Sequence, residues 1–164
     1  MAAMASTSAK LVEQLAARLL RDGKRICTAE SCTGGLIAKS FTDLAGSSDW
    51  FERGFVTYSN EAKNEMLAVP ASLITDYGAV SEPVAAAMAS GALRHSHADY
   101  AIAVTGVAGP SGGSAEKPVG TVWIAVASNQ EQRTRLYCFD GDRQAVREAT
   151  LQQAIADALQ LLDD

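Results

Sequence analysis

Residues 25–38, RICTAESCTGGLIA, give the strongest indication of the fold of this chain. The first part of this stretch, Arg25–Ala29, is rich in residues that favour strands, and its last part returns to apolar residues at helical spacing. The glycines between them, Gly34 and Gly35, are typical of a turn. The stretch therefore predicts a strand, a tight turn and a helix, with Ser31 where the strand ends.

The rest of the chain continues this alternation of strands and helices. Helices are expected over residues 8–22, 34–44, 60–67, 72–77, 81–95 and from 142 onward, and further strands over 51–58, 100–105, 120–128 and 132–139. The last two strands form a β-hairpin around a turn at Asn129–Glu131. The pattern predicts a single three-layer α/β/α domain over residues 1–164, with a mixed, mostly parallel sheet that ends in the hairpin. Residues 1–7 are expected to form a flexible N-terminus.

The composition is that of a globular protein with one buried core. Of the 164 residues, 48% are hydrophobic and 20% are charged. The net charge of -5 provides no broad basic surface for nucleic acid. A small anionic ligand is compatible with it, because a few local Lys and Arg side chains can outweigh the global charge.

Several classes of protein are disfavoured by what the sequence lacks. No apolar run approaches the roughly 20 residues that a membrane span requires, and residues 1–7 lack the pattern of a signal peptide. Three cysteines without a CxxC motif and only two histidines argue against a disulfide framework, a metal site or a Ser-His-Asp triad. We therefore expect a cytoplasmic protein with no metal or other cofactor and no membrane partner.

Ser31 is the first candidate for a catalytic residue. Backbone N–H groups at the start of a helix are unpaired and carry partial positive charge, so a hydroxyl beside them can attack a substrate while they stabilise the developing negative charge. The same geometry can hold a phosphate, and a serine before a helix is most often its N-cap. Gly34 and Gly35 favour close approach of a ligand. Cys32 is the second candidate nucleophile, and its ordinary role is that of a small buried residue.

The segment Tyr58–Lys63, YSNEAK, is the second candidate and also lies between a strand end and a helix. Lys63 is either an ordinary solvated lysine or a lysine with a lowered pKa that accepts the proton of Ser31, as in the Ser-Lys variants of the catalytic triad. Tyr58 is either a core residue or a hydrogen-bond donor to the reacting centre. Its place at the carboxyl end of a strand favours the second role.

The glycine-rich loop after the strand at residues 100–105 is the third candidate. Its N–H groups could wrap a phosphate, although it matches neither the Walker nor the GxGxxG pattern, and it could equally be a flexible surface loop. Its length favours a binding role. The residues expected to contact substrate here are Thr105, Gly106, Gly109, Gly112, Gly113 and Lys117.

The segment Asp140–Arg143 is the fourth candidate, with Arg147 one helical turn later. Arg143 and Arg147 share a helix face. They either pair with Asp142 or Glu148 at the surface or reach an anionic ligand, and the sequence leaves both possibilities open.

Six stretches resemble, in order, the motifs of the CinA C-terminal domain family. They are AESCTGG (29–35), YSNEAK (58–63), GAVSE (78–82), AVTGVAGP (103–110), EKPVG (116–120) and GDR (141–143). Each stretch alone is weakly specific. Together they extend over nearly the whole chain in the same order, which is a strong resemblance.

The resemblance implies the activity of the stand-alone members of this family, which hydrolyse the carboxamide of nicotinamide mononucleotide to nicotinic acid mononucleotide and ammonia. It implies catalysis without a metal, in pyridine nucleotide salvage. It also implies that Ser31 is the nucleophile and that Lys63 and Tyr58 are catalytic. The remaining residues expected to bind substrate are Cys32, Thr33, Gly34, Gly35 and Arg143.

Within this activity we expect N–H groups near Thr33–Gly35 or Thr105–Gly106 to hold the oxyanion. The loop Gly106–Gly113, Lys117 or Arg143 is expected to contact the phosphate. Because short loops form the site of a small domain, a neighbouring copy could cover it, so a homo-oligomer is also expected. Two alternatives are a non-catalytic nucleotide-binding module and a Ser-Lys amidase with a different small amide substrate.

Overall fold

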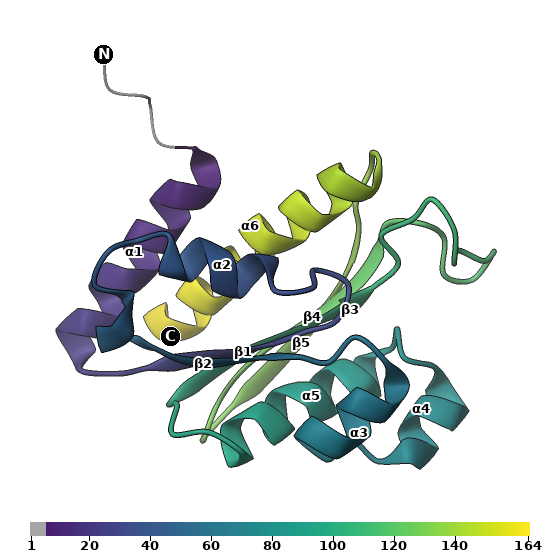
Figure 1. Cartoon of the computed structure of the whole chain (residues 1–164), viewed down its shortest axis with the longest axis horizontal. Helices are drawn as coiled ribbons and strands as arrows, with labels where there is room; N and C mark the ends of the chain where they lie inside the picture. The colour runs from purple at the N-terminus through teal and green to yellow at the C-terminus, as the bar shows by residue number, and fades with distance from the viewer. Residues whose placement is uncertain (1–5) are drawn as a thin grey trace.

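A five-stranded sheet separates two layers of helices in the computed structural model, which describes residues 6–164 (Figure 1). The strands are β1 (Ile26–Glu30), β2 (Phe51–Val56), β3 (Tyr100–Gly106), β4 (Thr121–Ser128) and β5 (Gln132–Cys138). They lie in the order β2-β1-β3-β4-β5. Strand β1 is parallel to both β2 and β3, whereas the pairings β3–β4 and β4–β5 are antiparallel. The predicted mixed sheet with a terminal hairpin is confirmed, and only β4 runs against the other strands.

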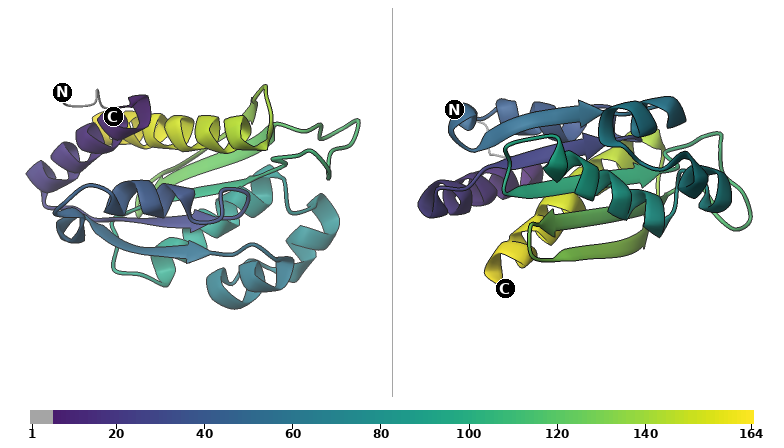
Figure 2. Two further views of the ribbon diagram at one scale, coloured as in Figure 1. Left: turned by 45° about the horizontal axis from the view of Figure 1, so that its top comes forward. Right: turned by 90° about the horizontal axis from the view of Figure 1, so that it is seen from below.

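Helices cover both faces of the sheet, as the sequence predicts (Figures 1 and 2). One layer contains α1 (Thr7–Asp22), α2 (Leu36–Thr42) and α6 (Arg143–Asp163), and the other contains α3 (Asn60–Leu67), α4 (Ala71–Tyr77) and α5 (Glu82–Arg94). A short 3₁₀ helix, η1 (Ser47–Asp49), precedes β2 and was not expected. Among the described residues, no helix is both long enough and apolar enough to cross a membrane.

The first helix begins and ends with the signals that its sequence contains. The side chain of Ser6 accepts a hydrogen bond from the N–H of Ala9, and Gly23 ends the helix in the left-handed conformation with φ 65°. The helix therefore begins inside the segment 1–7 that was expected to be flexible. The other part of that segment, residues 1–5, lies outside the described residues.

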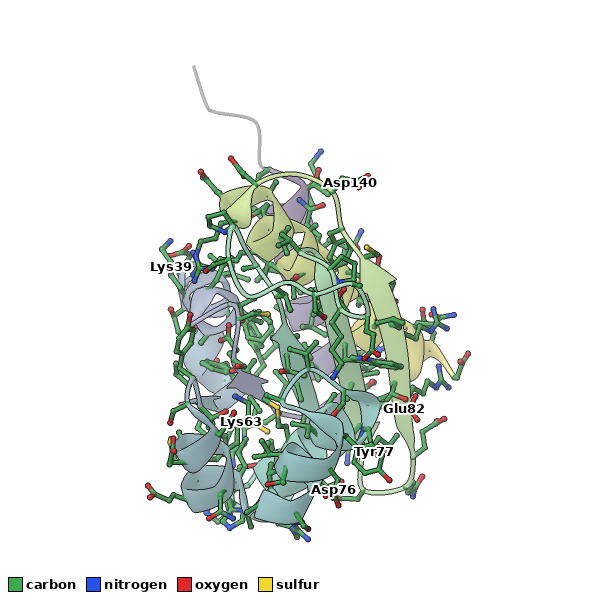
Figure 3. All side chains as sticks on the ribbon, turned by 90° about the vertical axis from the view of Figure 1, so that its right-hand side faces the viewer. Lys39, Lys63, Asp76, Tyr77, Glu82 and Asp140 are labelled. Carbon is green, nitrogen blue, oxygen red and sulfur yellow. The ribbon has the colours of Figure 1, made fainter. Side chains whose placement is uncertain are left out.

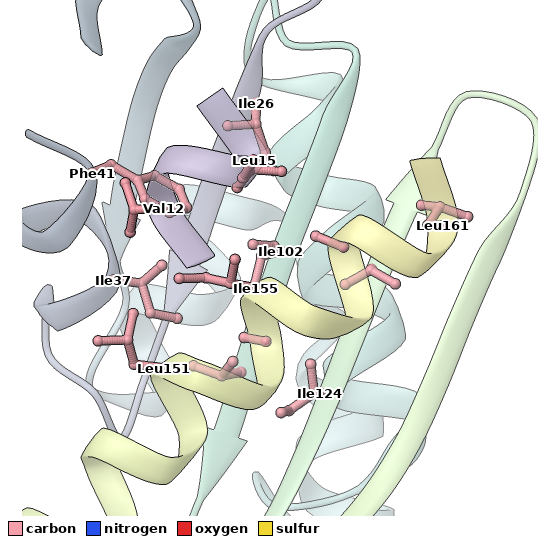
Figure 4. Close-up of a cluster of buried hydrophobic side chains, with 14 of the residues drawn as sticks. Val12, Leu15, Ile26, Ile37, Phe41, Ile102, Ile124, Leu151, Ile155 and Leu161 are labelled. Atoms are coloured by element: carbon pink, nitrogen blue, oxygen red, sulfur yellow. The ribbon is translucent and has the colours of Figure 1, made fainter. Parts of the chain in front are cut away.

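The two faces of the sheet carry side chains of different size, because alternate residues of a strand point to opposite faces. Facing α1, α2 and α6, the strands place large residues such as Ile102 and Ile124, which pack with Ile155 of α6 (Figure 4). Facing α5, they place mainly alanines: Ala29, Ala101, Ala103, Ala125 and Ala127. Strand β3 is buried on both faces, as its continuous apolar run predicts.

The carboxyl ends of the three parallel strands meet at one edge of the sheet. The register pairs Glu30 with Val104 on one side and with Val56 on the other. Just beyond the strands, the N–H of Ser31 donates to the carbonyl of Val104, and the N–H of Thr57 donates to the carbonyl of Glu30. The segments that follow β1, β2 and β3 therefore begin side by side, at the edge where α/β sheets usually bind ligands.

Candidate active site

Ser31 and Lys63 come together at this edge, although they belong to different segments. The Nζ atom of Lys63 lies 3.0 Å from the Oγ atom of Ser31. Lys63 sits in the first turn of α3, where the side chain of Ser59 caps the helix by accepting from the N–H of Ala62. Only 1% of Lys63 is exposed, and Figure 3 shows it within the body of the molecule. The alternative interpretation of Lys63 as a solvated lysine is wrong.

The surroundings of the Lys63 amine favour its neutral form. Its Nζ atom also donates to the carbonyl oxygens of Thr57, at 3.0 Å, and Tyr58, at 3.3 Å. No carboxylate of residues 6–164 forms an ion pair with it. Burial lowers the pKa of Lys63 below its ordinary value of 10.5, because the ammonium form loses its hydration. A neutral amine can donate to both carbonyls and direct its lone pair at the hydroxyl of Ser31.

A buried carboxylate holds the turn that carries Ser31, and the sequence analysis missed it. Glu30 is fully buried at the end of β1. Its carboxylate accepts from the hydroxyl of Thr33 at 2.6 Å and from the N–H groups of Ile37 and Ala38 at 2.9 and 3.0 Å. These two N–H groups belong to the first turn of α2, where a helix has unpaired donors and favours negative charge. An acidic residue shortly before a predicted helix was the signal that could have found it.

The same contacts leave Ser31 without a capping role. Gly35 occupies the N-cap position of α2, with φ 104°, and contributes no side-chain cap. The N-cap role considered for Ser31 is therefore wrong, and its hydroxyl is directed to Lys63. Among the described residues, the N–H groups of Cys32 and Thr33 have no hydrogen-bond partner. Unpaired N–H groups directly after a nucleophile are suited to hold an oxyanion.

Cys32 is poorly suited to act as the nucleophile. Its side chain is 6% exposed, and burial raises its pKa to about 12. The thiolate is the reactive form of cysteine, so this side chain remains an unreactive thiol at neutral pH. The geometry favours Ser31.

A cavity of about 250 Å³ adjoins the Ser31–Lys63 pair. Its lining residues are Ser31, Cys32, Tyr58, Asn60, Lys63, Ala79, Val80, Thr105, Gly106, Ala108 and Arg143. Within residues 6–164, no group of three or more His, Cys, Asp or Glu side chains is arranged to hold a metal ion. We refer to the cavity of about 250 Å³ as the catalytic cavity.

Tyr58 lies at the rim of the catalytic cavity and is 60% exposed. Its hydroxyl accepts a hydrogen bond from Arg143 at 3.2 Å, and only its backbone carbonyl contacts Lys63. No hydrogen bond joins its hydroxyl to Ser31. Of the two residues considered as proton acceptor, Lys63 is therefore the one in contact with Ser31.

A larger cavity, of about 850 Å³, lies next to the catalytic cavity. Its walls come from α2, the glycine-rich loop and the start of α6: Leu36, Ala108, Pro110, Val119, Gly141, Asp142, Arg143, Gln144, Arg147 and Glu148. Ala108 and Arg143 line both cavities, so the two spaces are neighbours. Together they offer room for a ligand larger than the reacting group.

The two arginines of α6 point to backbone carbonyls around the cavities. Arg143 donates to the carbonyl of Gly109 at 2.7 Å, and Arg147 donates to that of Thr33 at 2.8 Å. Among the described residues, neither arginine forms an ion pair with a carboxylate. Of the two possibilities that the sequence left open, surface pairing with Asp142 or Glu148 is therefore wrong, and both guanidinium groups are available to an anion.

The glycine-rich loop contributes less to the cavities than the sequence suggested. The hydroxyl of Thr105 donates to the carbonyl of Ala79, and Thr105 and Gly106 line the catalytic cavity. A Cβ atom at Gly106 would lie 2.8 Å from the carbonyl oxygen of Thr121, so this glycine is required by the contact between β3 and β4. Gly109 lines neither cavity, and its carbonyl accepts from Arg143, which lines both.

The outer part of this loop packs on itself. A Cβ atom at Gly109 or Gly113 would lie within 3.0 Å of Val119. The amine of Lys117 donates to the carbonyl of Tyr77 at 2.8 Å, at the end of α4. Gly112, Gly113 and Lys117 line neither cavity.

Comparisons with known proteins point to one family. The family model of the CinA C-terminal domain matches residues 8–162. A nicotinamide-nucleotide amidohydrolase PncC of Escherichia coli strain K12 is 57% identical over 93% of this chain and 91% of its own length. A CinA-like protein of Akkermansia muciniphila is 50% identical over 95% of this chain and 38% of its own length.

The fold also matches solved structures of this superfamily. A competence/damage-inducible protein of Agrobacterium tumefaciens has a TM-score of 0.94 and 43% sequence identity, over 100% of both chains. A CinA superfamily protein of Escherichia coli has a TM-score of 0.91 and 39% identity, over 98% of this chain and 94% of the other. The family match extends over nearly the whole sequence, and this chain belongs to the CinA C-terminal domain family.

Proposed function

We propose that this chain is a nicotinamide mononucleotide deamidase, which hydrolyses the carboxamide of its substrate to nicotinic acid mononucleotide and ammonia. The observation that carries the proposal is the contact between the buried amine of Lys63 and the hydroxyl of Ser31, beside a cavity. The name of the Escherichia coli relative, at 57% identity, supports the choice of substrate. The reaction would belong to pyridine nucleotide salvage.

The proposed chemistry meets the demands of an amide, which is a poor electrophile with a poor leaving group. The Oγ atom of Ser31 attacks the carboxamide carbon while its proton passes to the neutral amine of Lys63. The unpaired N–H group of Cys32, which lines the catalytic cavity, holds the oxyanion. Lys63 then returns the proton to the departing nitrogen, which leaves as ammonia and creates an ester on Ser31.

The second half of the reaction uses the same residues. Water attacks the ester carbon while Lys63 accepts a proton from it, and the bond to the Oγ atom of Ser31 breaks. The serine oxygen regains its proton from Lys63, and nicotinic acid mononucleotide is released. This sequence restores both side chains and consumes one water molecule for each ammonia produced.

The two cavities suggest how the mononucleotide lies. The catalytic cavity would receive the ring with its carboxamide, and the larger cavity would receive the ribose phosphate. Arg143 lines both spaces and has no carboxylate partner, which favours it as a phosphate contact. Lys117 is a weaker candidate for this contact, because its amine is bound to Tyr77 outside both cavities.

Ammonia release from nicotinamide mononucleotide tests the proposal. In Ser31→Ala we expect a fall of about 10⁴-fold or more, because the nucleophile is lost, whereas Cys32→Ala should retain most activity. A wild-type protein that binds the mononucleotide in calorimetry without releasing ammonia would be a binding module. Release of ammonia only from other pyridine carboxamides would identify an amidase with a different substrate. A cytoplasmic location and a homo-oligomeric state stay predictions from the sequence.

A further inference from the structure

We propose that Arg147 is a positioning residue, through which a phosphate dianion in the larger cavity stabilises the turn that carries Ser31. The phosphate of the substrate would then accelerate the chemical step as well as contribute to binding. This inference rests on the proposed function and deepens it, since it assigns a second role to the phosphate.

Arg147 connects the larger cavity to residues 31–35, which carry Ser31 and which we call the nucleophile turn. It lines the cavity from α6, and its Nη2 atom donates to the carbonyl of Thr33 at 2.8 Å. Its Nε atom is buried and has no hydrogen-bond partner in the structure. The guanidinium group therefore has one end on the turn and unused donors beside the cavity.

Thr33 is the residue through which this contact can reach Ser31. It is fully buried two residues after Ser31, and its hydroxyl donates to Glu30. Its carbonyl accepts from Arg147 and also from the N–H of Leu36, the first residue of α2. Thr33 directly follows Cys32, whose unpaired N–H is the proposed oxyanion donor. Of the contacts of Thr33, those with Arg147 and Leu36 come from residues that line the larger cavity, and only the one with Arg147 is made by a charged side chain.

The charge around Arg147 is not balanced by the protein. A guanidinium group has five N–H donors, and no carboxylate of residues 6–164 pairs with this one. The nearest acidic neighbours in the wall are engaged elsewhere: Glu148 accepts from Ser8, and Asp142 caps α6 by accepting from Ala145. Arg147 is half-buried, and its Nε–H is buried without a hydrogen-bond partner, which is unfavourable. The site therefore favours an anion.

A phosphate dianion has the chemistry that this wall would recognise. It accepts several charge-assisted hydrogen bonds, and arginine binds it through its planar fork. Arg143 lies one turn before Arg147 and lines the same cavity, which adds a second positive charge. A bound dianion would occupy the unused donors of Arg147 and fix its guanidinium group. The carbonyl of Thr33, and with it the turn, would become more rigid.

We therefore expect part of the binding energy of the phosphate to lower the free-energy barrier of the chemical step. Contacts to a part of the substrate that does not react can be used to orient the reacting groups, so that substrates without that part lose turnover as well as affinity. The source of the dianion can be the substrate itself or free phosphate. The two sources can be separated by supplying the dianion detached from the substrate.

The test measures ammonia release from nicotinamide riboside, which lacks the phosphate, with and without phosphite dianion. We expect the riboside to have a lower kcat than the mononucleotide and phosphite to raise its turnover at least about tenfold. Phosphite should compete with the mononucleotide, because both would occupy the larger cavity. Stimulation of the mononucleotide reaction by phosphite would place the anion elsewhere and overturn the proposal.

Arg147→Lys separates positioning from charge, because lysine keeps the charge and lacks the planar fork. We expect it to abolish the phosphite stimulation and to lower kcat for the mononucleotide about tenfold, with a smaller change in KM. The riboside reaction without phosphite should fall as well, because the contact with Thr33 is weakened in both conditions. The readout is therefore the ratio of riboside turnover with and without phosphite, which should approach one. A matched control is Arg21→Ala, which removes an exposed arginine of α1 and should leave all three measurements unchanged.

The outcomes distinguish this inference from the proposed function. Turnover of the mononucleotide without any phosphite stimulation of the riboside reaction overturns the coupling and leaves the Ser31–Lys63 mechanism intact. Retained stimulation in a folded Arg147→Lys also overturns it. Absence of ammonia release from the mononucleotide overturns both proposals. The wild-type experiment with phosphite decides the question even if the variant does not fold.

Discussion

Two glycine-rich turns follow buried strands at the same edge of the sheet, and they are held in different ways. The nucleophile turn, residues 31–35 after β1, is held by side chains that bond to it: the carboxylate of Glu30 and the guanidinium group of Arg147. The glycine-rich loop, residues 107–118 after β3, has no buried carboxylate bonded to it. It is held by close packing against its own chain, by backbone hydrogen bonds and by Arg143 at the carbonyl of Gly109. In the sequence, both had been expected to bind substrate.

The difference shows what a glycine-rich turn by itself indicates. The buried carboxylate of Glu30 and the half-buried guanidinium group of Arg147 bond to the nucleophile turn, and the hydroxyl of Ser31 stays available for chemistry. In the loop, glycines such as Gly113 allow close approach of Val119, and the loop's outer part contacts no cavity. A buried charge beside a turn is therefore better evidence for a catalytic site than glycine content.

The largest expected effect is that of removing the base next to the nucleophile turn. We expect Lys63→Met to lower kcat for ammonia release by about 10² to 10⁴-fold, the usual contribution of general acid–base catalysis. The matched control is Lys39→Met, which removes an exposed lysine of α2 that pairs only with Asp43 and should have no effect. Activity retained in Lys63→Met would show that Lys63 is not the base for Ser31. The nucleophile turn would then have no catalytic partner that the glycine-rich loop lacks.

The pH dependence of the same residue sharpens this test. Lys63 must be neutral to accept a proton, and burial lowers its pKa below 10.5. We therefore expect kcat/KM to rise with pH and to level off above the lowered pKa, at a pH below 10.5. In Lys63→Arg the rise should disappear, because arginine stays protonated. A rise of kcat/KM with pH that persists in Lys63→Arg would show that the titration belongs to another group.

The next effect concerns the carboxylate that holds the nucleophile turn. Glu30→Gln keeps the size of the side chain but replaces one acceptor oxygen with an amide nitrogen, so it cannot accept at both positions. We expect a loss of roughly 1.5–3 kcal/mol in the free energy of unfolding and a fall in kcat of up to about 10²-fold from misplacement of Ser31. Denaturant unfolding and ammonia release measure the two effects. Unchanged kcat would show that Glu30 does not position the nucleophile.

The corresponding change in the glycine-rich loop should affect stability and spare the chemistry. A Cβ atom at Gly113 would lie 2.9 Å from the backbone nitrogen of Val119. We expect Gly113→Ala to lower the free energy of unfolding by about 1–3 kcal/mol through overpacking, with kcat of the folded protein unchanged. The control is Ser111→Ala at an exposed position of the same loop. A large fall in kcat with normal stability would show that the loop takes part in catalysis.

The smallest effect is expected at the end of this loop. Lys117→Ala removes an exposed hydrogen bond to Tyr77 outside both cavities. We expect the KM for the mononucleotide to change by less than about twofold, because loss of a surface interaction is worth at most a few tenths of a kcal/mol. A tenfold rise in KM would instead support the phosphate contact that the sequence suggested for Lys117.

The amino-acid sequence alone was enough to predict the helices, the strands and their arrangement in layers. Apolar periodicity predicted the strands and the α-helices to within a few residues, because these patterns reflect contacts between near neighbours and the burial of one face. It also predicted that residues after β1 and β2 would form a site, since strand ends of an α/β sheet gather at one edge. The candidate pair Ser31 and Lys63 could therefore be named, although not its distance.

The contacts between the candidate residues follow from the tertiary structure and could not be predicted from the sequence. The strand order places β1 between β2 and β3, which brings Lys63 to Ser31 across 32 positions and Arg147 to Thr33 across 114. The packing of the helices and loops on the sheet also buries Glu30 beside α2 and brings the amine of Lys117 to the carbonyl of Tyr77. No local pattern encodes such contacts. They depend on how the layers pack, and burial then sets the pKa of Lys63 and the hydrogen bonds that hold the turn.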